Sequence, residues 1–115
     1  MSTMTPVTKI GGDAEQFPNV QVIWVDYDET TGVTVNPTSA AKGTMVIFKN
    51  SQGAKLKIDF LSPTGHGFET VSDSELCLLT IGGVYHFRCT FTFKGSDGDY
   101  TPTSGGLMEV SPPRP

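Results

Sequence analysis

The feature that most constrains the fold is the segment 84–94, in which apolar and polar side chains alternate without a break from Tyr85 to Lys94. One side of this run carries four aromatic residues and a cysteine: Tyr85, Phe87, Cys89, Phe91 and Phe93. The other side carries His86, Arg88, Thr90, Thr92 and Lys94. A period of two residues is that of a β-strand with one buried face, and five apolar side chains at this spacing cannot form one stripe on a helix. The run therefore predicts a half-buried strand.

Shorter segments with strand character occur along most of the chain. Strands are predicted at residues 20–27, 33–36, 44–49, 55–60, 76–81 and 107–110, between turns rich in Gly, Pro, Asn and Ser. The first of these is apolar on both sides, which predicts a strand covered on both faces with Trp24 in the core. Ser72 and Glu75 have the spacing of a capping box, which predicts one helical turn. About seven strands without a long amphipathic helical pattern predict an all-β sandwich.

Composition agrees with one small domain of this kind. The chain has 115 residues, of which 13 are Gly, 8 are Pro and 17% are charged. Frequent turn formers favour short strands, and this length suffices for one core without a disulfide or a metal. We expect a flexible arm at residues 1–18, the sandwich domain at 19–111 and a proline-rich tail at 112–115.

Charge and hydropathy argue against two classes of partner. The net charge is −4, and the Lys and Arg residues are scattered, so we expect no binding to nucleic acid or to an anionic membrane. The longest apolar run, residues 22–25, is far shorter than the roughly 20 residues of a membrane-spanning helix. The first residues also lack the charged start and apolar centre of a secretory signal. We therefore expect a cytoplasmic protein.

Two motifs go beyond a generic sandwich. Residues 83–89 follow the pattern G-x-Y-x-F-x-C, and residues 43–50 follow G-x-x-V-x-F-x-N. The first motif resembles the penultimate strand of cupredoxins, the small blue-copper sandwich proteins, and the second resembles their middle strand. The resemblance covers residues 20–110 and implies a cupredoxin-like, Greek-key β-sandwich.

The same resemblance implies that a blue-copper centre is missing. Cupredoxins bind copper through two His, one Cys and usually a weak axial Met. Cys89 stands at the position of the family's Cys, but Leu56 and Thr92 stand where the two His are expected. Met108 lies 19 residues after Cys89, too far for an axial ligand. We therefore expect no metal and no cofactor.

Cysteine and histidine supply the remaining candidates for chemistry. Cys89 lies among aromatic side chains, and burial there predicts an unreactive core thiol. A disulfide between Cys77 and Cys89 is an alternative that a reducing cytosol disfavours. His86 points to the face opposite Cys89 and is expected at the surface. His66 lies in a Gly-flanked loop, and it reaches Cys89 or Met108 if that loop folds over the end of the sandwich.

Acidic residues gather at two turns. Asp26, Asp28 and Glu29 form one cluster, and Asp97 and Asp99 form the other. Neither has the order of ligands of a helix-loop-helix calcium site, so both are predicted to be solvated turns. The sequence also has no Gly-rich phosphate loop, no Cys-x-x-Cys and no recognisable Ser-His-Asp spacing.

These observations favour a binding or assembly module over an enzyme. Sandwich domains offer loops at their ends and strand edges at their sides, so the expected partner is a protein or a small molecule, and edge strands could also join copies of the chain. Three alternatives stay open. They are a metal-binding or redox protein that uses Cys89 with His66 and Met108, an immunoglobulin-like interaction domain, and an enzyme whose site the sequence does not reveal.

Overall fold

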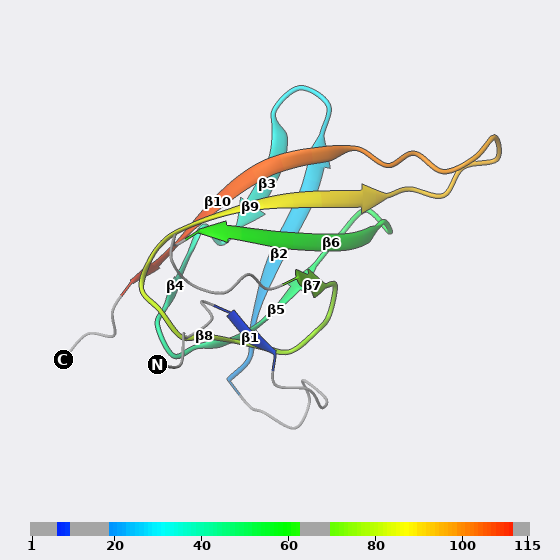
Figure 1. The fold of residues 1–115 in the computed structure, drawn as a ribbon. Helices are drawn as coiled ribbons and strands as arrows, with labels where there is room; N and C mark the ends of the chain where they lie inside the picture. Colours follow the sequence, from blue (N-terminus) through cyan, green and yellow to red (C-terminus); the bar gives the residue numbers. More distant parts are fainter. Residues whose placement is uncertain (1–6, 10–18, 63–69, 112–115) are drawn as a thin grey trace.

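The computed structural model describes residues 7–9, 19–62 and 70–111, which form ten strands and no helix (Figure 1). The strands are β1 (Val7–Lys9), β2 (Gln21–Asp28), β3 (Gly32–Asn36), β4 (Ser39–Ala41), β5 (Met45–Lys49), β6 (Lys55–Ser62), β7 (Thr70–Ser72), β8 (Cys77–Leu79), β9 (Gly83–Thr92) and β10 (Thr103–Ser111). The prediction of an all-β chain is confirmed for this part of the sequence, with ten strands in place of about seven.

The strands form two five-stranded sheets. Sheet A has the order β1-β8-β5-β2-β3, and sheet B has the order β4-β10-β9-β6-β7. Each sheet contains one parallel pair, β2 with β5 in sheet A and β4 with β10 in sheet B, among antiparallel pairs. Parallel neighbours need long connections, so the chain passes between the sheets rather than running as a series of hairpins.

Strand β9 lies in the middle of sheet B, between β10 and β6 (Figure 1). Its inward side chains are fully or almost fully buried: Tyr85, Phe87, Cys89 and Phe91. His86 and Arg88 on the other face are exposed, so the alternation predicted for this strand is confirmed. Phe93 follows the strand and is half-buried, and its backbone pairs with that of Tyr100.

One hydrophobic core joins the two sheets. The ring centroids of Phe48 in sheet A and Phe60 in sheet B are 5.8 Å apart, and those of Tyr27 in sheet A and Phe91 in sheet B are 5.6 Å apart. Interdigitation of the inner faces of two sheets produces contacts of this kind. The arrangement is two layers of β-sheet around a shared interior.

The outer face of β2 corrects two predictions. Ile23 and Val25 are buried, but Trp24 between them is 40% exposed. A strand turns successive side chains to opposite faces, so two buried neighbours place Trp24 on the outside of sheet A. Trp24 is therefore not a core residue, and β2 is not fully covered on both faces.

Three strands that the sequence did not predict, β1, β4 and β7, have three residues each. Strand β1 falls within the predicted flexible arm, where it pairs antiparallel with β8. The rest of that arm, residues 1–6 and 10–18, lies outside the described residues, as does the tail at 112–115. Segments this short owe their strand conformation to the partner strand, which a local pattern does not reveal.

Residues 72–75 form a tight turn, and the predicted helical turn is wrong. The amide of Glu75 donates to the carbonyl of Ser72 at 3.3 Å, and the amide of Ser72 donates to Oε1 of Glu75 at 2.9 Å. Ser74 has φ of 65°, which is a left-handed conformation incompatible with a right-handed helical turn. The hydrogen bonds between Ser72 and Glu75 therefore close a turn between β7 and β8 and do not begin a helix.

Candidate functional site

Cys89 is completely buried on the inner face of β9. Its cross-strand neighbours are Ile58 on β6 and Ser104 on β10, and Phe87 and Phe91 flank it along the same face. Burial, and to a lesser extent the charge of Asp59, raises the pKa of the thiol from 9.0 to about 12. The thiol keeps its proton at neutral pH and is a poor nucleophile and a poor metal ligand.

Apolar side chains fill the interior next to Cys89, on the side where the resemblance to cupredoxins predicts the first His ligand. Leu56 is buried and pairs across the strands with Phe91, which is also buried. Thr92 remains in strand β9, opposite Lys55, at an odd spacing from Cys89. The side chains of Thr92 and Cys89 therefore point to opposite faces of sheet B, so even a ligand at position 92 would point away from the thiol.

The other residues of the possible metal set are not brought together. Met108 is buried on β10 opposite Tyr85, four residues beyond the partner of Cys89, which is about 13 Å along the strand. His86 lies on the exposed face of β9, and His66 lies outside the described residues. Across residues 7–9, 19–62 and 70–111, no three His, Cys, Asp or Glu side chains form a group able to hold a metal ion.

Cys77 is a second buried free thiol, and it lies on β8 in sheet A. Its Sγ donates to the carbonyl of Glu75 at 3.4 Å. Cys77 and Cys89 are thus on different sheets and are not joined by a disulfide.

Two of the clustered acidic residues have structural roles. The carboxylate of Asp26 accepts hydrogen bonds from the amide and hydroxyl of Ser51, at 2.8 and 2.6 Å. Asp28 accepts the amides of Thr30 and Thr31, which lowers its pKa and closes the turn after β2. Glu29 has no hydrogen bond or ion pair with any residue that the structure describes, and it is exposed. In the second cluster, Asp99 pairs with Lys94 at 3.4 Å.

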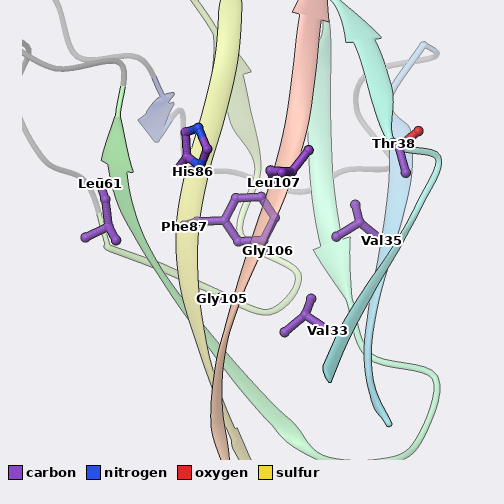
Figure 2. A pocket seen from close by; sticks show the side chains of 9 residues that line it. All are labelled: Val33, Val35, Thr38, Leu61, His86, Phe87, Gly105, Gly106 and Leu107. Atoms are coloured by element: carbon purple, nitrogen blue, oxygen red, sulfur yellow. The ribbon is translucent and has the colours of Figure 1, made fainter. Parts of the chain in front are cut away.

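A hollow of about 540 Å³ lies at the corner where β3 passes β10 without pairing with it (Figure 2). In Figure 2, Leu61 and His86 lie on one side, Val33, Val35 and Thr38 lie on the other, and Phe87 lies over Gly106 between them. Leu107, also in the lining, is 55% exposed. His86 is the one titratable side chain among the described residues that line this hollow, so the lining offers no acid–base pair.

The corner hollow depends on the lack of side chains at two positions of β10. A Cβ on Gly106 would stand 2.8 Å from Cε2 of Phe87 and 3.1 Å from Cγ1 of Val33. A Cβ on Gly105 would meet nothing closer than the carbonyl oxygen of Phe87 at 3.8 Å. Gly106 therefore allows the Phe87 ring to cover the strand, whereas Gly105 leaves open space on the outer face.

Aromatic rings gather at the other end of β9, at a site we call the aromatic end: Tyr27, Phe91, Phe93 and Tyr100. The rings of Phe93 and Tyr100 are stacked with centroids 6.1 Å apart, and the Tyr27 ring lies 6.5 Å from each of them. Tyr100 is brought there by the hairpin between β9 and β10, which extends beyond the sheets (Figure 1). A hollow of about 270 Å³ is lined by Tyr27, Phe93 and Tyr100 together with Glu29 and Gln52.

Two amide side chains fix the position of Tyr27. Pairing of β2 with β5 ends at Trp24 and Lys49, and side chains of the following loop take over the role of β5. Asn50 donates to the carbonyl of Val25 at 2.9 Å. Gln52 accepts the amide of Tyr27 at 2.9 Å and donates to its carbonyl at 2.7 Å. The backbone amide and the carbonyl of Tyr27 are therefore both hydrogen-bonded, which fixes the backbone that carries its ring.

The sequence did not identify the aromatic end as a site. Tyr27 was predicted within a strand and Phe93 on the inner face of another, while Tyr100 belonged to a Gly- and Asp-rich turn. An aromatic residue in such a turn was a signal, because an exposed turn has no need of a large ring. The fold shows that the Tyr100 ring contacts Phe93 and also Tyr27, which is far away in the sequence.

Comparisons with known proteins identify no relative: no family model, no curated protein and no solved structure matches this chain. In the part of the chain that the structure describes, no helix is long and apolar enough to cross a bilayer.

Proposed function

We propose that this chain is a cupredoxin-like, Greek-key sandwich domain without a copper centre, and that it acts as a non-enzymatic binding module whose ligand lies at the aromatic end. Two features support the resemblance. The G-x-Y-x-F-x-C motif falls on β9, the penultimate of the described strands, and G-x-x-V-x-F-x-N includes β5, the central strand of sheet A. These positions in the chain and in the sheets support the resemblance.

The proposal rests on one observation. Apolar side chains surround Cys89, which stands at the position of the Cys ligand in cupredoxins. Blue-copper chemistry needs a thiolate with imidazole nitrogens beside it. Here the Cys89 thiol is protonated, and Leu56 and Phe91 fill the adjacent interior. This interior supports packing rather than electron transfer.

Mixed sheets disfavour the immunoglobulin-like alternative. An immunoglobulin sandwich of the constant type is built from two antiparallel sheets. Each sheet of this domain contains a parallel pair, β2 with β5 and β4 with β10. The two parallel pairs therefore disfavour an immunoglobulin sandwich of the constant type.

Exposed aromatic area next to a hollow is the reason for placing the ligand at the aromatic end. Tyr100 is 52% exposed although it belongs to a packed group of rings. Binding sites combine apolar and aromatic walls with a few polar groups, and the carboxylate of Glu29 is such a group here.

The copper-free part of the proposal is tested by adding copper to the fully reduced protein and recording the visible spectrum. We expect no intense blue band, because the ligands that produce it are missing. A blue band that Cys89→Ala removes and Cys77→Ala preserves would overturn the proposal.

The binding part is tested by recording amide NMR spectra while adding four small probes separately: tetramethylammonium, glucose, phosphate and acetate. We expect at least one probe to shift the amides of Tyr27, Gln52, Phe93 and Tyr100 in a saturable way, with Glu109 and Val110 unaffected. If none of the four shifts these amides, the aromatic end is not a binding site and the proposal fails.

A further inference from the structure

The aromatic end has the composition of a receptor for a positively charged organic group. Three rings, those of Tyr27, Phe93 and Tyr100, lie within 6.5 Å of one another and border the hollow. Aromatic faces carry partial negative charge and attract cations, most effectively ammonium groups whose hydration shell is weak.

The charged side chain that lines the hollow is negative, which is opposite to the charge of an ammonium group. Glu29 lines it as an exposed carboxylate, without a hydrogen bond or an ion pair to any described residue. The described residues of the lining include no Lys or Arg, and the nearby Lys94 pairs with Asp99. The pKa of Tyr27 is raised, first by its hydrogen bond with Tyr100 and then by burial and the charges of neighbouring groups, Glu29 among them. The carboxylate of Glu29 in the lining therefore disfavours an anionic ligand.

The hollow offers too few hydrogen-bond donors and acceptors to bind a neutral sugar. A sugar needs several donors and acceptors placed around its hydroxyl groups. The carboxamide of Gln52 is already used on both sides by the backbone of Tyr27. What is left is one carboxylate and two phenol groups that hydrogen-bond to each other beside an aromatic wall, which suits a charged, weakly hydrated group better than a polyol.

We propose that the hollow bordered by Tyr27, Phe93, Tyr100 and Glu29 binds an organic ammonium group, with the rings against its alkyl substituents and the carboxylate of Glu29 as its counter-ion. This inference rests on the proposed function, because it names the ligand class of the same site. A volume of about 270 Å³ fits the ammonium head of a larger molecule rather than a whole drug-sized ligand.

The test compares tetramethylammonium with neopentyl alcohol, an uncharged probe of similar shape, by titration of the full-length protein monitored by NMR. We expect tetramethylammonium to bind at least about five-fold more tightly than the alcohol. Equal binding of the two probes, or no binding of tetramethylammonium, overturns the inference.

Three variants assign the attraction to the proposed groups. Tyr100→Leu keeps an apolar wall but removes the π-face, and it should weaken tetramethylammonium binding about five-fold, whereas Tyr100→Phe should retain most of it. Glu29→Gln should weaken binding about three-fold at low salt, with a smaller effect at high salt. Glu109→Gln, which removes the same charge on β10 away from the hollow, is the matched control. Unchanged binding in both Tyr100→Leu and Glu29→Gln contradicts the inference.

The outcomes separate this inference from the proposed function. Shifts at the aromatic end with glucose, phosphate or acetate but not with tetramethylammonium leave the binding module standing and remove the ammonium ligand. A copper–thiolate band removes the copper-free module whatever the ammonium titration shows.

Discussion

At the scale of single residues, the structure gives unlike roles to residues of the same type. Gly105 and Gly106 are adjacent on β10, yet an added Cβ has room at Gly105 and none at Gly106. Asp26 and Asp28 hold turns together, while their neighbour Glu29 has no hydrogen bond or ion pair with a described residue and lines the hollow at the aromatic end. Residue type alone therefore does not distinguish structural from functional positions in this domain.

Gly106→Ala should destabilise the protein by about 1–3 kcal/mol, because its Cβ would overlap Phe87 and Val33 in a packed interior. Gly105→Ala is the control and should change stability by no more than about 0.5 kcal/mol. Urea unfolding of the two variants checks both values. Equal stability of the two variants would contradict the proposed overlap.

Alkaline pH should weaken the fold through Cys89. The buried thiol keeps its proton to about pH 12, whereas the thiol of the unfolded chain loses it near 9.0. The unfolded state thus binds fewer protons than the folded state over this interval. The stability that the protonated thiol contributes is therefore complete below pH 9.0 and is lost as the pH rises to about 12. The free energy of unfolding should fall by about 1.4 kcal/mol per pH unit from this group.

Urea unfolding across that pH interval measures the effect, with Cys89→Ala as the comparison. The slope of stability against pH should be shallower in the variant by about the amount due to one thiol. Parallel slopes in the two proteins would show that the Cys89 thiol ionises normally in the folded state.

At the scale of elements, a loop takes over from a strand. Asn50 donates to the carbonyl of Val25, and its Oδ1 accepts the amides of Gln52 and Ala54 at 2.8 and 3.0 Å. The Asn that ends the G-x-x-V-x-F-x-N motif therefore organises the loop that holds β2 after β5 has ended. This role of Asn50 needs no metal ion.

Asn50→Ala should cost about 2–3 kcal/mol, since it removes three hydrogen bonds to backbone groups and leaves the partly buried carbonyl of Val25 and amide of Ala54 without these partners. Thr31→Ala, a change at an exposed turn residue, should stay within about 0.5 kcal/mol of the original protein. Chemical denaturation tests both. A loss below 1 kcal/mol for Asn50→Ala, with the same backbone fold, would show that water replaces the side chain.

At the scale of the whole molecule, both sheets contribute to one interior. Phe48 and Phe60 meet across the layers, and Cys77 and Cys89 lie in the same core cluster although they belong to different sheets. Neither sheet buries its inner face without the other. The domain should therefore fold as one unit.

Unfolding should accordingly give one transition, with the same midpoint by circular dichroism and by thiol labelling. In the native protein both cysteines should resist labelling, and in denaturant both should react. Labelling of one cysteine before the spectroscopic transition would mean that one sheet opens separately.

Local pattern alone determined the all-β class and the inward side of β9, because alternation of side chains is a property of the strand itself. Alternation also predicted the buried thiol of Cys89 from its aromatic neighbours. Trp24 was misplaced since its burial depends on what covers the outer face of sheet A, and Ser72–Glu75 was read as helical because the capping spacing also closes a turn.

Tertiary structure decided the candidate site and three of the four shortest strands. Tyr27 and Tyr100 are distant in the sequence, and they meet because β2 ends beside the hairpin that follows β9. Strands β1, β4 and β7 exist through hydrogen bonds to their partners and carry no signal of their own. Contacts between distant segments depend on strand order, and strand order is a result of packing the whole chain into two layers.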